Sequence, residues 1–312
     1  MAEPDRSSVQ YQENLPLRDF STLQIGGPCR YFTTIHHLDD WVAVFHWSKR
    51  RSLPRLVIGE GSNILFHDAG FRGLVVRNEL KGIHRQGTLV EVAGGENLGE
   101  FIRFLNRCGL AGMERMYGIP GTVAGAVVGN AGAYGQEISD HLTEVDVWTG
   151  ATLRILKAGA LEFAYRDSIF KRNPDWFIVR CRFEFHRSHS DLQAISEAIL
   201  ARRTEKYPPR LRCPGSYFKN VLVEQLTPEQ IRRIPTGFIQ FGKIPAGRLL
   251  DAVGAKGACR GQACFASYHA NLIINCGGAT AHDVTTLAQE YSDRVRDQFS
   301  LQLEPEIRII PY

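Results

Sequence analysis

Four stretches of the chain repeat apolar residues at the three- and four-residue spacing of an amphipathic helix. They are residues 38–51, 96–108, 191–206 and a long stretch capped by Thr280. Their ends carry typical helix-terminating residues, such as Gly109 after the second stretch and Pro208 after the third. A capping box that starts at Thr227 predicts a shorter helix, and residues 243–250 begin another.

Short apolar or alternating runs between these helices predict strands. They lie at residues 29–32, 56–58, 74–77, 89–93, 143–148, 176–179, 181–185 and 268–276. The alternation of strands and helices indicates a mixed α/β fold. Residues 1–19 are polar and are expected to form a loose lead-in, and the polar run at 186–190 predicts a domain boundary.

The segment 115–136 is the most unusual part of the pattern, because it has no charged residue from Met116 to Gln136. Its length and neutrality suit a membrane span, but its six glycines, Pro120 and Asn130 argue against one. A backbone with so few Cβ atoms allows a flat or anionic ligand to approach its amide N–H groups. Two interpretations stay open on these residues alone: a nucleotide cofactor site and a tightly turned buried core segment.

A second glycine-rich loop, Gly-Glu-Gly-Ser-Asn at residues 59–63, directly follows the buried strand at 56–58. A strand that opens into such a loop is a recurrent way of offering amides and hydroxyls to phosphate oxygens. The loop is not a P-loop, and Ile64 stands where a dinucleotide-binding fingerprint has its third glycine. A plain turn is an equally good interpretation of this loop by itself.

Composition changes this picture in three ways. The net charge of +4 over 312 residues, without a block of Lys or Arg, suits anionic small molecules and argues against nucleic-acid binding. The N-terminus has no apolar signal segment, so we expect a cytoplasmic protein without membrane insertion. The seven cysteines are odd in number and scattered, which predicts reduced thiols and neither a disulfide framework nor a metal site.

Nine pieces of the sequence match one family in the right order. They are residues 21–28, 59–65, 118–126, 130–135, 165–168, 215–220, 244–247, 269–273 and 303–308. Each piece is short, but the ordered set is specific, and it resembles the UDP-N-acetylenolpyruvoylglucosamine reductases, the MurB family. The short interval between Arg166 and Ser216 resembles the subtype that lacks an extra substrate-covering loop. Ser21 and Ala124 depart from the family's usual asparagine and glycine.

The resemblance implies an α/β (α+β) fold. It consists of a two-lobed FAD-binding domain of the vanillyl-alcohol-oxidase/PCMH type and a smaller α/β substrate-binding domain. The expected parts are residues 1–80 for the first FAD-binding lobe, 81–187 for the second, and 188–312 for the substrate-binding domain. The C-terminal strand is expected to return to the active site.

The resemblance also implies the reaction. Family members use NADPH to reduce FAD, and hydride then passes to the enolpyruvyl double bond of UDP-N-acetylglucosamine enolpyruvate, which gives UDP-N-acetylmuramate for peptidoglycan synthesis. Because hydride adds to the terminal carbon, negative charge develops on the neighbouring carbon and its carboxylate. Such a species needs a cation or hydrogen-bond donor and a source of a proton.

Three residues match the family's catalytic positions. Ser216 matches the proton donor, Arg166 matches the arginine that faces the substrate carboxylate, and Glu306 matches the glutamate that helps to stabilise the enol. Glu304 lies nearby on the same expected strand face, and spacing alone does not choose between the two glutamates. The family pattern of a glutamate followed by an aliphatic and a basic residue selects Glu306.

The same resemblance assigns binding residues. The residues expected at FAD come from both glycine-rich segments: Gly59, Gly61, Ser62, Asn63, Gly118, Ile119, Pro120, Gly121, Thr122 and Gly125. The residues expected at the UDP-sugar substrate are Tyr165, Lys219, Asn220, His269 and Asn271. No metal is expected, the partners are small molecules, and the expected oligomeric state is a monomer.

Two other functions compete with this reductase. One is an oxidase or dehydrogenase of the same flavoprotein superfamily, which would have no reason to carry the motifs around Ser216, Arg166 and Glu306. The other is a UDP-sugar-binding protein that has lost turnover, and the presence of all three residues argues against it.

Overall fold

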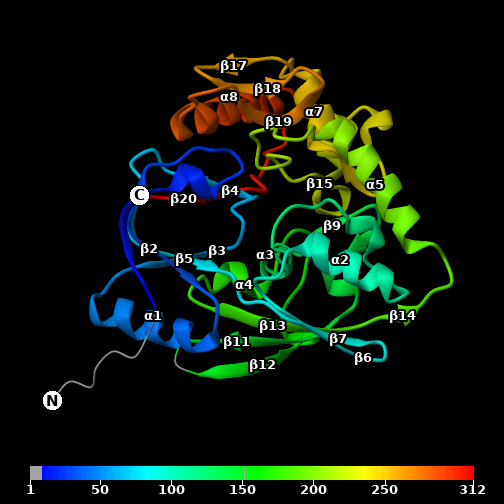
Figure 1. Cartoon of the computed structure of the whole chain (residues 1–312). Helices are drawn as coiled ribbons and strands as arrows, with labels where there is room; N and C mark the ends of the chain where they lie inside the picture. Colours follow the sequence, from blue (N-terminus) through cyan, green and yellow to red (C-terminus); the bar gives the residue numbers. More distant parts are fainter. Residues whose placement is uncertain (1–8, 151) are drawn as a thin grey trace. The chain divides into compact units, whose positions relative to one another are not determined.

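The computed structural model describes residues 9–150 and 152–312 (Figure 1). The chain folds into two compact units, each assembled from separate stretches of sequence. Unit 1 comprises residues 9–15, 29–60 and 72–205, and unit 2 comprises residues 16–28, 61–71 and 206–312. Each unit buries a hydrophobic core of its own.

Unit 1 is built on two sheets. The first has the order β1-β2-β5-β3, with strands Gln12–Pro16, Pro28–Ile35, Phe71–Asn78 and Arg55–Ile58. The second is antiparallel and has the order β12-β11-β13-β7-β6, with strands Leu153–Lys157, Leu142–Trp148, Phe177–Glu184, Leu89–Ala93 and Ile83–Gln86. Two short antiparallel pairs complete the unit: β8 (Leu110–Ala111) pairs with the distant β14 (His186–Arg187), and β9 (Gly132–Ala133) forms a hairpin with β10 (Gln136–Glu137).

Helices of unit 1 pack on both sides of β13, which is apolar on both faces. The helices of the unit are α1 (Leu38–Arg50), α2 (Leu98–Arg107), α3 (Val123–Val128), α4 (Ile169–Arg172) and α5 (Leu192–Lys206) (Figure 1). Phe177 of β13 stacks on Trp41 of α1, with ring centroids 4.1 Å apart. Phe183 of β13 packs against Phe101 of α2, with ring centroids 5.4 Å apart. Hydrophobic burial on both sides of one strand therefore holds the unit together.

Unit 2 is organised around α8 (Ala281–Phe299). Its buried face packs on an antiparallel sheet of β17 (Cys259–Arg260), β18 (Ala263–Ala266) and β19 (His269–Asn275), as Figure 1 shows. The helix α7 (Ala246–Ala252) packs on β19, and β20 (Arg308–Ile310) runs parallel to β4 (Ile64–Phe66). The remaining elements are α6 (Pro228–Arg232), β15 (Val221–Leu222) and β16 (Lys243–Ile244).

Most elements expected from the apolar pattern are confirmed, including α1, α2, α5, α6 and α8. The prediction that residues 1–19 form a loose lead-in is wrong for the part that the structure describes, because residues 12–16 form β1 at the edge of the first sheet. Residues 1–8 lie outside the described residues. The runs 176–179 and 181–185 form the single strand β13. In the part of the chain that the structure describes, no helix is long and apolar enough to cross a membrane.

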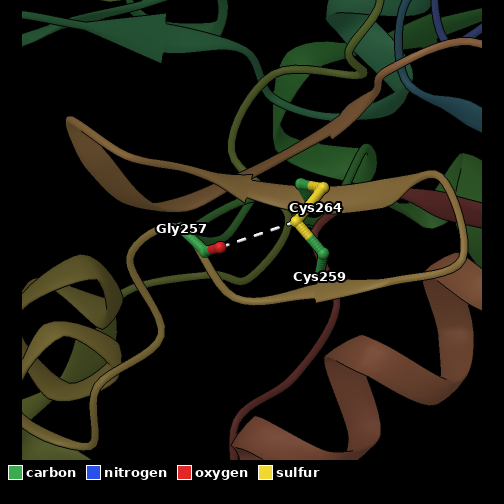
Figure 2. Close-up of a disulfide and its surroundings, with 3 residues drawn as sticks. All are labelled: Gly257, Cys259 and Cys264. Atoms are coloured by element: carbon green, nitrogen blue, oxygen red, sulfur yellow. Dashed lines mark hydrogen bonds between the residues drawn. A yellow bond between two sulfur atoms is a disulfide. The ribbon is translucent and has the colours of Figure 1, made fainter.

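The prediction of seven reduced thiols is wrong for two of them. β17 and β18 form a hairpin that sets Cys259 opposite Cys264, with Cα atoms 4.1 Å apart. Directly opposite residues of an antiparallel pair can lie this close, and the two sulfurs form a disulfide (Figure 2). Figure 2 also shows the Gly257 carbonyl, whose oxygen lies 3.5 Å from Sγ of Cys259.

Candidate active site

In unit 1, the loop after β3 lies against the start of α3. Glycine is required at position 59, since a Cβ there would sit 2.5 Å from Oγ1 of Thr122. The carboxylate of Glu60 accepts hydrogen bonds from the N–H of Gly121 at 3.1 Å and from Nδ2 of Asn97 at 2.7 Å. These contacts join parts of the two glycine-rich segments that the sequence singled out separately.

The segment that leads into α3 turns in ways that favour glycine. Gly118 and Gly121 have φ values of +82° and +120°, which residues with a Cβ rarely adopt. The N–H groups of Ile119 and Gly125 are used inside the segment, on a backbone carbonyl and on the hydroxyl that caps α3. The expected role of these two amides at a cofactor therefore has no support from their hydrogen bonding.

Other amides of these loops fit a pyrophosphate group such as that of FAD. Within residues 9–150 and 152–312, no acceptor lies in hydrogen-bond reach of the N–H groups of Gly59, Glu60 and Thr122. Unpaired backbone N–H groups are rare away from water, and several together suit an anionic oxygen. Pro120, between the two positive-φ glycines, is exposed and has no N–H to contribute. These loops are therefore the part of unit 1 that would hold the cofactor.

Unit 1 also carries Tyr165 and Arg166 at the tip of a tight turn closed by two backbone hydrogen bonds of 3.1 Å. Arg166 has a φ of +55°, an uncommon conformation for a residue with a side chain. Its guanidinium donates to the carbonyl oxygens of Asn130 at 3.3 Å and Gly132 at 2.8 Å, and lies 5.3 Å from the centroid of the Tyr165 ring. The turn thus holds a permanently charged group against the end of the segment 115–136.

Asn130 is a candidate that the sequence reasoning missed. The residue is buried, has a φ of +40°, and donates through Nδ2 to Glu137 at 2.9 Å and to the carbonyl of Ala164 at 3.0 Å. Its Oδ1 is buried and has no hydrogen-bond partner in the described part of the chain. An unpaired buried amide oxygen costs free energy, so its retention beside Arg166 points to a positioning role. A polar residue inside an uncharged apolar run was the available signal.

In unit 2, Ser216 precedes a segment that pairs with the stretch before β20. The N–H of Lys219 donates to the carbonyl of Glu304 at 2.9 Å, and the N–H of Glu306 donates to the carbonyl of Tyr217 at 2.7 Å. These two bonds bring both candidate glutamates into one antiparallel pair with the residues that directly follow the candidate serine, although the two stretches are distant in sequence.

Asn271 of β19 fixes the same segment from a second direction. Its Oδ1 accepts from the N–H of Phe218 at 2.9 Å, its Nδ2 donates to the carbonyl of Phe218 at 2.8 Å, and its own carbonyl accepts from Tyr217 at 3.0 Å. The side chains of Tyr217 and Phe218 are buried in the unit 2 core, and this burial raises the pKa of the Tyr217 phenol. Both ends of the Asn271 amide are thus engaged with the backbone that carries Ser216, which makes Asn271 a positioning residue.

The two glutamates have different surroundings. The carboxylate of Glu304 pairs with Nζ of Lys219 at 3.1 Å, and the Glu304 side chain is 72% exposed. Glu306 is half-buried, and its carbonyl oxygen accepts from Nδ2 of Asn63 at 3.1 Å. Glu304 is thus a solvent-exposed member of an ion pair, whereas Glu306 lies in a more enclosed position.

The second half of the loop after β3 belongs to unit 2. Thr22 holds it, since its N–H donates to the carbonyl of Gly61 at 3.2 Å and its Oγ1 lies 3.4 Å from the carbonyl oxygen of Ser62. Glycine is required at position 61, because a Cβ there would sit 1.8 Å from the carbonyl oxygen of Phe20.

His269 and Asn220 complete the predicted set in unit 2. Burial, helped by the charge of Lys206, lowers the pKa of His269 to about 4, so the imidazole is neutral near pH 7. Its Nδ1 accepts the N–H of Asn271 at 3.2 Å, which leaves the proton of the neutral ring on Nε2. Oδ1 of Asn220 accepts from the N–H of Ala246 at the start of α7, at 3.1 Å.

Tyr207 is a second residue that the sequence reasoning missed. Its hydroxyl oxygen lies 3.2 Å from Oγ of Ser216, and either group can donate in this hydrogen bond. The only signal in the sequence was its position after a predicted helix and directly before Pro208.

Comparison with known proteins agrees with this arrangement. Residues 30–159 match the FAD binding domain family, and residues 207–310 match the family described as UDP-N-acetylenolpyruvoylglucosamine reductase, C-terminal domain. The chain is 38% identical to the UDP-N-acetylenolpyruvoylglucosamine reductase of Solibacter usitatus, with 95% of each chain covered. It is 35% identical to the reductase of the same name from Chlamydia muridarum, with 96% of this chain and 95% of the other covered.

The fold agrees as well. The crystal structure of the UDP-N-acetylenolpyruvylglucosamine reductase of Thermus caldophilus matches 97% of this chain and 99% of its own, with a TM-score of 0.75 and 29% identity. The expected mixed α/β fold with an FAD-binding domain is thereby confirmed. The chain belongs to the UDP-N-acetylenolpyruvoylglucosamine reductase family and is an FAD-dependent oxidoreductase.

Proposed function

We propose that the chain catalyses the NADPH-dependent reduction of UDP-N-acetylglucosamine enolpyruvate to UDP-N-acetylmuramate, a step of peptidoglycan precursor synthesis. The observation that carries the proposal is the antiparallel pairing of residues 217–219, which directly follow Ser216, with residues 304–306 in unit 2. A proton donor and a carboxylate in one rigid pair are what protonation of an enol requires. FAD, when bound, supplies the hydride that NADPH has delivered to it.

Ser216 is the proposed proton donor. Its Oγ would give a proton to the carbon next to the substrate carboxylate after hydride has reached the terminal carbon. A serine hydroxyl is a weak acid in water, so its position must be well defined for this step. Support comes from Asn271, which holds the two residues that follow Ser216 by their backbone.

Arg166 is the proposed partner of the substrate carboxylate. A guanidinium is always charged and can donate two parallel hydrogen bonds to a carboxylate. Its two bonds to backbone carbonyls and its left-handed turn support a fixed orientation before substrate arrives. Glu306 would act on the same enol as a hydrogen-bonding carboxylate, and its half-buried position supports this role over that of the exposed Glu304.

The remaining predicted residues form the proposed binding set. Gly59, Gly118, Gly121 and Thr122 of unit 1, and Gly61, Ser62 and Asn63 of unit 2, would face the cofactor through their backbone or side chains. Tyr165, Lys219, Asn220 and His269 would face the UDP-sugar. A neutral His269 would donate a hydrogen bond from Nε2 and would not supply charge to the diphosphate, which leaves Lys219 as the cation for that role.

The proposal also covers the domain bounds, the location in the cell and the oligomeric state. It divides the chain into FAD-binding lobes at 1–80 and 81–187 and a substrate-binding domain at 188–312, and it describes a cytoplasmic monomer that acts on small molecules. Light scattering that gives the mass of one chain would support the monomer, and a mass of two chains would overturn it.

The test is a visible spectrum of the purified holoenzyme under anaerobic conditions. NADPH is expected to bleach the flavin absorbance, and UDP-N-acetylglucosamine enolpyruvate is expected to restore it. Bleaching without recovery would support a flavoprotein but contradict the proposed substrate, and would favour another oxidase or dehydrogenase. A protein that stays colourless after FAD is supplied would favour the non-catalytic sugar-binding alternative.

A further inference from the structure

The surroundings of Ser216 contain a second hydroxyl group that the proposed reaction does not yet use. Oη of Tyr207 lies 3.2 Å from Oγ of Ser216, a long hydrogen bond in which either hydroxyl can donate. Both residues are half-buried members of unit 2. The contact is between side chains, so it constrains the Oγ atom itself and not only the backbone of the serine.

Three features hold the phenol in this position. Its ring packs at the edge of a small cluster formed by Cys213, Ala266 and Leu272. Nζ of Lys206 lies 4.9 Å from the centroid of the ring, a cation–π contact. Pro208 follows directly, and a residue before proline is restricted to extended backbone conformations.

The chain between the two hydroxyl-bearing residues is anchored as well. Oγ1 of Thr22 donates to the carbonyl of Cys213 at 2.7 Å, and the N–H of Asn275 donates to the carbonyl of Arg212 at 2.9 Å. These bonds tie the stretch 207–216 to the rest of unit 2. The distance between the two hydroxyl groups is therefore maintained by packing on one side and by backbone hydrogen bonds on the other.

We propose that Tyr207 is a positioning residue for Ser216 that also returns the proton Ser216 loses. This inference rests on the proposed function. When Ser216 protonates the substrate carbon, a C–H bond forms, the Oγ–H bond breaks and an alkoxide remains. The phenol transfers its own proton to that alkoxide, because a phenol is a stronger acid than an aliphatic alcohol. The resulting phenolate takes a proton from water, so one proton is consumed in each turnover.

The variant Tyr207→Phe tests this role, since it removes the hydroxyl and keeps the ring. Reduction of the flavin by NADPH is expected at the rate of the unaltered protein. Recovery of flavin absorbance on addition of the enolpyruvyl substrate is expected to slow about 10-fold, the size of effect that one lost hydrogen bond produces. The substrate concentration that gives the half-maximal rate is expected to stay unchanged. The solvent deuterium isotope effect on the recovery rate is expected to increase, and the pH profile of the recovery rate is expected to shift.

Tyr268→Phe is the matched control, because it removes a half-exposed phenol of unit 2 that makes no hydrogen bond to Ser216 in the described structure. It is expected to leave the recovery rate and the isotope effect unchanged. A second readout needs no substrate: the thermal unfolding of Tyr207→Phe, Ser216→Ala and the double variant. If the two residues interact, the melting temperature of the double variant should fall by less than the sum of the decreases in the two single variants.

The outcomes separate the two proposals. If the unaltered protein never recovers its colour with substrate, the proposed function fails, whatever the unfolding cycle shows. If it recovers and Tyr207→Phe recovers equally fast with the same isotope effect, the role of Tyr207 is overturned. A raised half-maximal substrate concentration with an unchanged maximal rate also overturns it, because Tyr207 would then bind substrate and not act through Ser216.

Discussion

The proposed cofactor loops around Gly59 in unit 1 and the proposed substrate segment around Ser216 in unit 2 differ in the groups that they offer to a ligand. The first region offers backbone, and its geometry depends on the absence of side chains, since a methyl group at position 59 would meet Thr122. The second region offers side chains, and its geometry depends on Asn271 and the stretch 304–306. The comparison teaches that a backbone site is visible in the sequence through its glycines, although distant residues such as Thr122 and Gly121 also hold it, whereas a side-chain site is visible only once its distant partners are known.

The largest expected effect separates chemistry from cofactor binding. Ser216→Ala should leave flavin bleaching by NADPH intact and slow recovery with the enolpyruvyl substrate by about 10²–10⁴-fold, the usual contribution of a proton donor. Stopped-flow absorbance of both half-reactions checks this. A normal recovery rate would remove Ser216 from the mechanism and would leave unit 2 with a binding role only.

The next largest effect is expected from Asn271, which holds the segment after Ser216 from the distant strand β19. Asn271→Leu removes both hydrogen bonds to Phe218 and leaves its buried N–H and C=O unpaired, which should lower the free energy of unfolding by about 2–5 kcal/mol. Chemical denaturation measures the loss. Asn271→Asp keeps the acceptor but buries a carboxylate against the carbonyl of Phe218, so a loss at least as large is expected near neutral pH. Equal stability of all three proteins would show that Asn271 does not hold this segment.

A smaller effect tests the backbone region. Gly59→Ala forces a displacement of Thr122, with a cost of about 1–3 kcal/mol for overpacking, and should lower FAD affinity about 10-fold or more. Fluorescence titration of the apoprotein with FAD provides the measurement. Gly159→Ala is the control, because a Cβ there meets nothing within 4 Å and the backbone has no positive φ. Equal loss in both variants would show a general stability effect.

Acid pH should affect the side-chain region through His269. The pKa of His269 is about 4 in the folded chain, whereas a histidine in the unfolded chain has its ordinary pKa of about 6.5, so the unfolded chain binds more protons between these values. Stability from this group is complete above pH 6.5 and is lost as the pH falls towards 4. Denaturation at a series of pH values should show a shallower loss in His269→Asn than in the unaltered protein. An unchanged slope in His269→Asn would reject the assignment.

The smallest effect concerns cysteines. The disulfide between Cys259 and Cys264 leaves five of the seven cysteines as free thiols, and three of these, Cys29, Cys108 and Cys181, belong to unit 1. Burial raises the pKa of Cys29 to about 11, which should make it slow to react. Protein denatured without reductant should show five reactive thiols, and seven after reduction. Seven thiols before reduction would contradict the disulfide.

The sequence by itself determined most of the secondary structure. The apolar spacing specified α1, α2, α5 and α8, because helix periodicity and capping act within a few residues. The glycines at 59–63 and 118–125 left open a ligand loop and a tight turn or buried core segment. Ordered motifs also identified Ser216, Arg166 and Glu306 as candidates, through their resemblance to one family.

Tertiary structure alone decided which groups meet. Residues 217–219 pair with 304–306, Glu304 forms an exposed ion pair with Lys219, and the amide of Asn271 is engaged with backbone. The spacing of residues also did not predict four other features. They are the contact of Tyr207 with Ser216, the contact of Asn130 with Arg166, the edge strand β1 and the disulfide. The physical reason is that periodicity reports which side of an element is buried, whereas hydrogen-bond partners and strand edges depend on where distant segments are brought together.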